Sequence, residues 1–275
     1  MRRSKLIKLC YIWGCILCFP CILAAQKDNE YSFNFKIYSA SVVDTFQILV
    51  SLPDEYYNTD EIYPIVYLLD ADRSFGMTHD IIRWLNLGRE LPPVILIGFA
   101  YKEDWWQKRS RDYTPYHDKD NTWGEWPLAG GASNFISFIK NELEIKLDTF
   151  RINKNAKSII GHSFGGLFCL HVLYTNPNLF NNYLIISPAV IWNDYAVLED
   201  TRELINAKNP IKVFTASGSL EDQEKLVLPW MRLNEMMNQD QFKHVNWKSQ
   251  LYDKQTHVSL IPAAITDGLK FLFDN

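Results

Sequence analysis

The chain has 275 residues, of which 47% are hydrophobic and 22% are charged. This composition is typical of a globular protein with a full core, and it excludes a disordered chain, a collagen and a pure coiled coil. No linker rich in Gly, Ser or Pro and no run of charge divides the sequence, so we expect one domain after the N-terminal segment.

The first 25 residues have the organisation of a secretory signal peptide. Four Lys or Arg residues lie within the first eight positions and precede an uncharged stretch, residues 9–23, that ends at Ala24-Ala25. This stretch is shorter than the roughly 20 residues that a membrane-spanning helix needs, so we expect cleavage near Ala25. Residues 1–25 are then the signal, residues 26–275 form a single domain, and the protein is exported to the periplasm or secreted. It contacts a membrane only if the segment is retained or lipidated.

Removal of this segment makes the chain more acidic. The whole chain has 28 Lys and Arg against 32 Asp and Glu; four of the basic residues leave with the signal, which leaves 24 against 32, a net charge of −8. A protein of this charge without a basic cluster is not expected to bind nucleic acid. Four of the five cysteines also lie in the segment, so Cys169 remains alone and no intramolecular disulfide can form.

The remaining sequence predicts strands first and then strands alternating with helices. Stretches rich in β-branched and aromatic residues, or continuously apolar, predict strands at residues 31–37, 41–52, 63–69, 94–99, 158–160, 183–186, 211–216 and 245–251. Apolar residues at helical spacing predict helices at residues 135–147, 167–174, 225–237 and 262–273. This order predicts an α/β fold with a mostly parallel central sheet and helices on both faces. A site is then expected at the carboxyl ends of the strands.

A G-x-S-x-G motif lies between a predicted strand and a predicted helix, at Gly161-His162-Ser163-Phe164-Gly165. Such a motif places its serine on a strained tight turn, and the glycines let strand and helix approach each other. The alternative is a chance match to a short pattern, but the apolar strand before it and the helix after it favour a nucleophilic Ser163. We expect His162 to pack within the turn rather than to act as a base.

A nucleophilic serine needs a histidine as base, and a carboxylate that orients the histidine. In sheets of this type the order along the chain is serine, acid, histidine. His257 lies in the loop after the last predicted strand and returns to the carboxyl edge, whereas His244 lies at the opposite edge. The strand 211–216 leads into the adjacent Glu221 and Asp222, of which only one can face the base. We choose Glu221 and keep Asp222 as the alternative acid; a Ser–His pair with little help from a carboxylate is a further alternative.

Acyl transfer develops negative charge on a carbonyl oxygen, which two backbone N–H groups must stabilise. Phe164, the residue after the nucleophile, supplies one of these donors. The turn after the strand 63–69 supplies the other, and we expect it to be the backbone N–H of Asp72. The side chain of Asp72 then either binds substrate or caps the segment that follows.

Several stretches, in order and at similar spacing, carry a likeness to a known family. They are residues 63–70, 92–95, 111–115, 130–132 and 161–166, Ser187-Pro188 followed by Trp192, and Thr256-His257. Together they resemble the esterase D family of α/β-hydrolases, in particular the branch of the siderophore (enterobactin-type) esterases and their relatives. The resemblance implies an α/β-hydrolase fold and hydrolysis of carboxylic esters with no metal and no organic cofactor.

The resemblance also bears on the site. It implies Ser163 as nucleophile and His257 as base, and it favours Glu221, because the acid of this family follows a strand-ending glycine by a few residues. Many relatives have His-Gly or Asp-Gly after the third strand, whereas this chain has Asp70-Ala71. The chain therefore departs from the family pattern at the loop that would bind the oxyanion.

Residues 101–126 are rich in tryptophan, tyrosine and arginine and fall where α/β-hydrolases carry substrate-facing loops. We expect Arg109 and Arg111 to pair an anionic group of the substrate, and Trp105 and Trp192 to contact its rings. For each tryptophan taken singly, packing against the body of the protein is the better expectation. No cluster of His, Cys, Asp and Glu has the spacing of metal ligands, so we expect no metal.

The sequence thus favours a secreted serine esterase that acts through an acyl-enzyme on a small-molecule ester, such as a siderophore ester or an aromatic or sugar ester. An acyltransferase on the same scaffold is the first alternative. The second alternative is a non-catalytic binding protein of this fold, against which the complete set of serine, acid and histidine counts.

Overall fold

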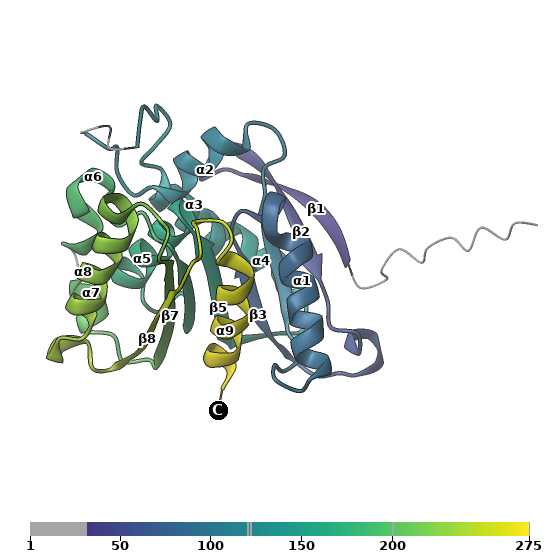
Figure 1. Cartoon of the computed structure of the whole chain (residues 1–275). Coiled ribbons are helices and arrows are strands. Elements are labelled where there is room, and N and C mark those ends of the chain that lie inside the picture. The colour runs from purple at the N-terminus through teal and green to yellow at the C-terminus, as the bar shows by residue number, and fades with distance from the viewer. Residues whose placement is uncertain (1–31, 120, 122, 200, 275) are drawn as a thin grey trace, which may run out of the picture. The chain divides into compact units, whose positions relative to one another are not determined.

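The computed structural model describes residues 32–119, 121, 123–199 and 201–274, so the predicted signal peptide lies outside the described residues. The described chain is built on one sheet with the strand order β1-β2-β4-β3-β5-β6-β7-β8 (Figure 1). Within these residues no helix combines the length and the apolar character that a membrane crossing requires.

The sheet is mostly parallel. Its strands are β1 (Ser32–Ser39), β2 (Asp44–Ser51), β3 (Tyr63–Leu68), β4 (Ile95–Ala100), β5 (Ile152–His162), β6 (Asn182–Ile186), β7 (Ile211–Gly218) and β8 (Val245–Tyr252). β1 and β2 are antiparallel to each other, β2 is antiparallel to β4, and the strands from β3 to β8 run parallel.

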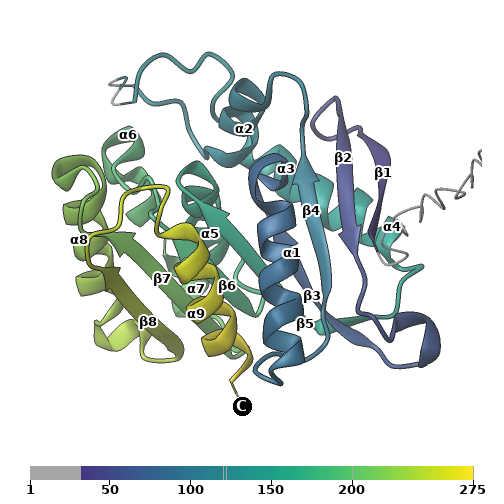
Figure 2. The same ribbon diagram turned by 45° about the vertical axis from the view of Figure 1, so that its right-hand side comes forward.

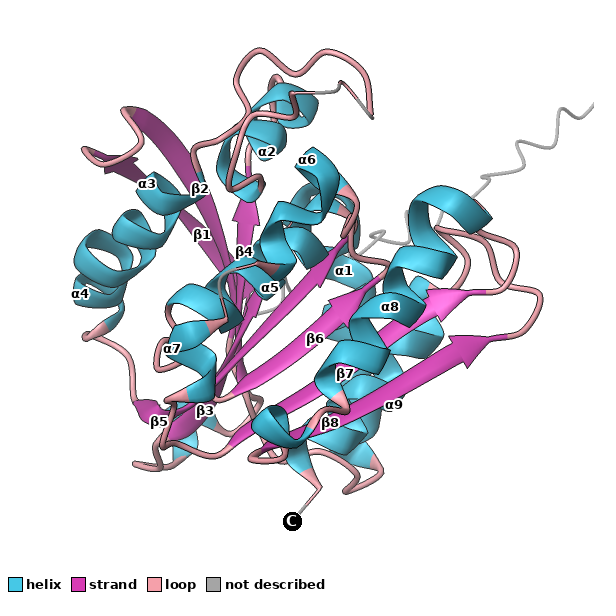
Figure 3. Ribbon diagram, turned by 90° about the vertical axis from the view of Figure 1, so that its left-hand side faces the viewer, coloured by secondary structure: helices cyan, strands magenta, loops and turns pink. Residues whose placement is uncertain are grey.

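Helices cover both faces of the sheet, which confirms the predicted α/β architecture. They are α1 (Ala71–Leu87), α2 (Trp105–Tyr113), α3 (Ala132–Phe138), α4 (Glu144–Leu147), α5 (Phe164–Thr175), α6 (Trp192–Tyr195), α7 (Arg202–Ile205), α8 (Leu228–Met237) and α9 (Ile261–Phe273). α1 and α9 lie side by side on one face, and α5, α7 and α8 lie on the other (Figures 1 and 3).

Successive strand residues enter the core on opposite faces of the sheet. In β3, Ile65 and Tyr67 belong to the cluster under α5, whereas Val66 and Leu68 belong to the cluster under α1 and α9. All four side chains are at most 2% exposed. Because both faces of the central strands are buried, their sequences are continuously apolar rather than alternating.

The structure contains every predicted strand and helix, with shifted ends. The helix predicted at residues 135–147 is α3 and α4 joined by a π-helical turn at Ile139–Leu143. The helix after Ser163 begins at Phe164, three residues earlier than predicted. Four helices were not predicted: α1 after β3, α2 after β4, α6 after β6 and α7 before β7.

The parallel strands end at the edge of the sheet where α2 and α6 lie (Figure 2). β3 is followed there by Asp70 and α1, β5 by Ser163 and α5, and β7 by the loop that carries Glu221. Segments that are far apart in the sequence therefore bring chemically active side chains to one edge, as the sequence predicted for an open parallel sheet.

Candidate active site

Ser163 lies on a sharp turn between β5 and α5. Its backbone has φ 59° and ψ −116°, a conformation that a residue with a side chain rarely adopts. The turn is held from both sides, because the N–H of Ser163 donates to Ile186 O at 3.0 Å and the N–H of Leu167 donates to Ser163 O at 2.9 Å. β6 and the first turn of α5 thus stabilise the strained serine.

The glycine before the turn allows β5 and α5 to approach closely. A Cβ atom on Gly161 would lie 2.2 Å from Gly165 O and 2.7 Å from Cys169 Sγ, which are far inside contact distance. Cys169 is fully buried on α5 behind the turn. The spacing of the motif therefore has a steric reason in this chain.

Glu221 contacts His257 across the carboxyl edge of the sheet. Glu221 is 5% exposed, and its Oε2 lies 3.0 Å from His257 Nδ1. Its other oxygen, Oε1, accepts hydrogen bonds of 2.6 Å from the N–H of Gly218 and from the hydroxyl of Ser187. Burial opposes ionisation of the carboxyl, but the bonds from His257, Ser187 and Gly218 outweigh it and hold the pKa of Glu221 below its ordinary value.

This contact also defines the state of the histidine ring. An ionised carboxylate only accepts hydrogen bonds, so Nδ1 of His257 carries a proton and its Nε2 is the basic nitrogen of the neutral ring. The ring is about one-third exposed, with a side-chain exposure of 33%. His257 is therefore oriented by a buried carboxylate and still open to the solvent side, as a general base requires.

Asp222, next in the chain, has a different role in the structure. Its carboxylate accepts the N–H groups of Glu224 at 3.0 Å and Lys225 at 2.9 Å and thereby caps the helical segment that begins at Gln223. Of the two adjacent carboxylates, the structure brings Glu221 to His257 and directs Asp222 to the backbone.

His162 packs beside the candidate base. Its Nε2 lies 2.8 Å from the backbone O of His257, and the two ring centroids are 4.3 Å apart. Because a carbonyl oxygen only accepts, this nitrogen of His162 is the donor. Burial, together with the nearby His257 and Arg109, lowers the pKa of His162 well below its ordinary value, so the ring is neutral at physiological pH. The structural role agrees with the expectation for this residue.

Ser163 and His257 line one cavity of about 370 Å³. Its wall is mostly apolar and comes from the ends of β3, β5 and β6, from the beginnings of α1 and α9, and from α2. The apolar lining residues are Leu68, Leu69, Trp105, Trp106, Ile160, Ile186, Val258, Ile261 and Ile265. The polar groups in the wall include Asp70, Arg73, Arg109 and His162. A small apolar cavity with a serine and an oriented histidine in its wall suits nucleophilic attack on a small-molecule ester.

The candidate oxyanion donors lie at the beginnings of two helices. Phe164 is the first residue of α5, and Asp72 is the second residue of α1. The carboxylate of Asp72 accepts the N–H groups of Tyr101 and Lys102, both at 2.8 Å, so it fixes the end of β4 to α1 and does not cap this helix. Asp70, immediately before α1, has the strained φ of 54°, and it is followed by Ala71, where the chain departs from the family pattern. Backbone N–H groups at both helix beginnings favour negative charge.

The four residues expected to contact substrate fall in different surroundings. Trp105 and Arg109 are in the cavity wall, whereas Arg111 pairs with Asp112 and Asp44 at 2.7 and 3.0 Å. Trp192 is 1% exposed; its Nε1 donates to a backbone carbonyl and its ring packs against Phe164 at 5.0 Å. The structure therefore gives Arg111 and Trp192 intramolecular partners and leaves Trp105 in the wall of the cavity that Ser163 also lines.

The structure adds two participants that the sequence did not assign. Asp70 forms a two-pronged ion pair with Arg109, and Ser187 donates to the candidate acid. Both residues lie in stretches that carried the family likeness, which was the signal that could have singled them out. Ser187 also has a strained backbone, with φ 43°. Strained backbones cluster at functional sites, and those of Asp70, Ser163 and Ser187 lie at the ends of three neighbouring strands.

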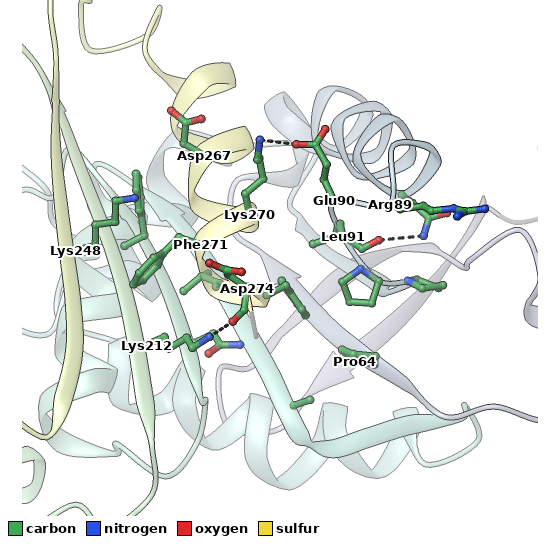
Figure 4. A pocket seen from close by; sticks show the side chains of 18 of the residues that line it. Pro64, Arg89, Glu90, Leu91, Lys212, Lys248, Asp267, Lys270, Phe271 and Asp274 are labelled. Atoms are coloured by element: carbon green, nitrogen blue, oxygen red, sulfur yellow. Dashed lines mark hydrogen bonds and ion pairs between the residues drawn. The ribbon is translucent and has the colours of Figure 1, made fainter.

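A larger hollow, of about 1140 Å³, lies at the opposite edge of the sheet (Figure 4). Among the described residues that line it there is no Ser, Thr, Cys or His. Two of its lysines have partners within the chain: Lys270 pairs with Glu90 at 2.5 Å, and Lys212 donates to the backbone O of Asp274. Volume alone therefore does not identify the site, and the chemistry favours the smaller cavity.

The chain is similar to known esterases. Residues 39–258 match the protein family described as Putative esterase. The ferri-bacillibactin esterase BesA of Bacillus subtilis is 30% identical over 232 residues, which are 76% of this chain and 78% of that protein. The crystal structure of the BES protein from Bacillus cereus superposes with a TM-score of 0.80 at 30% identity, covering 98% of this chain and 99% of the other. An IroE-like serine hydrolase from Shewanella oneidensis has a TM-score of 0.78 at 25% identity, covering 88% and 80%.

Proposed function

Because the chain belongs to the Putative esterase family and is a carboxylic-ester hydrolase, we propose that it acts as a serine esterase with Ser163 as nucleophile, His257 as base and Glu221 as the orienting acid. The observation that carries the proposal is the 3.0 Å contact of Glu221 with His257, whose ring shares a cavity with Ser163. The strained backbone of Ser163 supports it further.

The proposed reaction has two halves. His257 Nε2 takes the hydroxyl proton of Ser163 as Oγ attacks the ester carbonyl, and the imidazolium is stabilised by ionised Glu221. The N–H groups of Phe164 and Asp72 stabilise the oxyanion. His257 then gives its proton to the leaving alcohol, which leaves an acyl group on Ser163. Water, activated by the same nitrogen, attacks the acyl group and releases the acid.

Hydrolysis of a short-chain p-nitrophenyl ester by the full-length chain tests this mechanism, together with labelling by a fluorophosphonate. We expect Ser163→Ala to lower kcat by about a thousandfold or more and to abolish labelling. Ser137→Ala is the matched control, because the hydroxyl of Ser137 donates to a carbonyl on α3, outside the cavity, and this variant should behave as the wild type. A wild-type chain that neither turns over nor labels, or labelling that survives in Ser163→Ala, would contradict the mechanism.

For the substrate, we propose a siderophore ester or another aromatic or sugar ester. The relatives described above include a ferri-bacillibactin esterase, and the cavity wall offers the rings of Trp105 and Trp106 for stacking. A panel of siderophore and feruloyl esters should therefore give higher kcat/KM than an acetate ester. Added alcohol in the same assay measures transfer of the acyl group; a product ester in place of the acid would favour an acyltransferase.

We also propose that the chain is exported by its N-terminal segment. The supporting feature is the basic start followed by the uncharged residues 9–23. Expression with the segment in a bacterial host should give a protein in the periplasm or medium whose intact mass begins near Gln26. A full-length mass in the membrane fraction would show that the segment is retained.

A further inference from the structure

Two arginines contribute charge to the wall of the candidate cavity, and one of them is neutralised. Arg109 is 3% exposed, and its Nε and Nη2 donate to the two carboxylate oxygens of Asp70 at 2.7 and 2.8 Å. A further bond of 3.3 Å joins Nη2 to the backbone O of His162. The donors of Arg109 thus fix α2 to the turns of the site, and its charge is balanced by Asp70.

Arg73 differs from Arg109 in every one of these respects. It is exposed, lies on the first turn of α1 and lines the same cavity. Its guanidinium carbon is 4.9 Å from the centroid of the Trp105 ring. Among the described residues it has no carboxylate partner, because Asp70 is occupied by Arg109 and Asp72 by the N–H groups of Tyr101 and Lys102.

The position of Arg73 at the start of its helix also leaves its charge unstabilised. The first turn of a helix of 17 residues carries partial positive charge, which disfavours a cation and favours an anion. Helix α1 therefore does not stabilise the charge of Arg73, and the aromatic face of Trp105 is its observed contact. Within the described part of the chain, Arg73 thus presents a cation without a carboxylate partner at the α1 side of the cavity, next to an aromatic surface.

We propose that Arg73 is a specificity-determining residue that binds an anionic group of the ester substrate, a carboxylate or an ionised phenol, beside a ring or chain lying against Trp105. The proposal rests on the proposed function, in that Ser163 and His257 must act in this cavity. It transfers to Arg73 the role that the sequence suggested for Arg109 and Arg111, whose donors are engaged within the chain.

Two matched pairs of substrates test this with the full-length chain. One pair compares p-nitrophenyl hexanoate with mono-p-nitrophenyl adipate, which replaces the terminal methyl of the acyl chain by a carboxylate. The other compares p-nitrophenyl butyrate with its analogue that carries a carboxylate on the leaving ring. For each pair the measured quantity is the ratio of kcat/KM for the charged ester to that for the neutral ester.

In Arg73→Gln this ratio should fall about fivefold to tenfold in at least one pair, through KM rather than kcat, because a charge-assisted hydrogen bond at a partly exposed site is lost. Arg73→Lys should retain a good part of the preference, and added salt should weaken the preference of the wild type. Arg83→Gln is the matched control: Arg83 is also exposed on α1, but it pairs with Asp54 at 2.8 Å and lies outside this cavity.

Ratios in both pairs that are equal in the wild type and in Arg73→Gln would overturn the assignment of Arg73. This result differs from failure of the proposed function, in which the wild type would hydrolyse neither the charged nor the neutral esters and would not react with a fluorophosphonate. An equal fall in Arg83→Gln would also overturn the assignment, because it would reflect the general charge of α1 and not a bound anion.

Discussion

Glu221 and Asp222 are neighbours in the chain with the same charge, yet they bind different partners. Of the two carboxylates only Glu221 contacts the candidate base, so Glu221→Gln should lower kcat by about a thousandfold to ten-thousandfold, because a neutral amide does not stabilise the imidazolium. Asp222→Asn removes the same charge but keeps a good helix cap, so its kcat should remain close to that of the wild type. Steady-state kinetics on one ester measures kcat for both variants. An equal loss of kcat in the two would show that the acid role is assigned wrongly to Glu221.

Order along the chain could narrow the acid to this pair and no further, and it was the family resemblance that favoured Glu221. The deciding contacts come from Ser187, 34 positions before Glu221, and from His257, 36 positions after it. Such contacts depend on which strand ends lie next to each other in the sheet, and the spacing of apolar residues along the sequence does not predict this. For the same reason the sequence could place Arg109 near the site but not show that its donors are engaged by Asp70. The chemical roles in the site and their order along the chain were predictable, whereas the contacts between individual side chains were not.

The turn between β5 and α5 should be intolerant of a single methyl group. Gly161→Ala would place a Cβ 2.2 Å from Gly165 O, which is backbone and cannot rotate away, so we expect a loss of about 3 kcal/mol or more in the free energy of unfolding and a loss of activity. Gly76→Ala makes the same change in α1, where no atom lies within 4 Å, and it should stabilise the protein by about 0.5–1 kcal/mol. Denaturant unfolding compares them; similar stability of the two variants would contradict the steric argument.

Two of the four helices that were not predicted, α1 and α2, show the limits of hydrophobic patterning. α2 buries Arg109, Ser110 and Asp112 along with Tyr113, so its inward face is largely polar. The positions of its apolar residues therefore do not indicate which face is buried. α1 buries Ile82 and Leu85 but exposes Trp84 and Leu87 at 73% each, which blurs its apolar stripe. A helix is predictable when its buried face is apolar and its exposed face is polar. The buried face of α2 is held largely by ion pairs, and α1 packs on an apolar cluster but also exposes large apolar side chains. Both contribute residues to the candidate site.

At the scale of the whole sheet, apolar runs predicted which strands are buried on both faces but not which strands are neighbours. β4 lies between β2 and β3, so a strand that comes later in the chain separates two earlier ones. The chain reaches this order because the crossover through α1 brings β4 beside β3 as a parallel strand, and the other edge of β4 pairs with β2 as an antiparallel strand. The result matters for the site, because the ends of β3, β5, β6 and β7 become consecutive at one edge.

Protonation of His162 should couple the stability of the whole molecule to pH. Burial keeps the folded ring neutral, whereas the unfolded chain takes up a proton as the pH falls through the ordinary value of 6.5. The unfolded state then binds more protons, so stability is complete above this pH and decreases below it, by at most about 1.4 kcal/mol per pH unit. The lowered pKa of Glu221 acts in the same direction, but only below its ordinary value of 4.5.

The interval between about pH 5 and 6.5 therefore isolates His162 from Glu221. His162→Gln keeps a donor for the backbone O of His257 but cannot be protonated, so its free energy of unfolding should decrease less steeply than that of the wild type in this interval. The pKa of the partly buried His79 is also lowered, first by burial, but His79 is present in both proteins and its contribution cancels in the difference. Urea unfolding at several pH values measures the two slopes. Parallel curves would mean that His162 takes up its proton equally in the folded and the unfolded chain. The contact between His162 and the backbone O of His257 would then not depend on a neutral His162 ring.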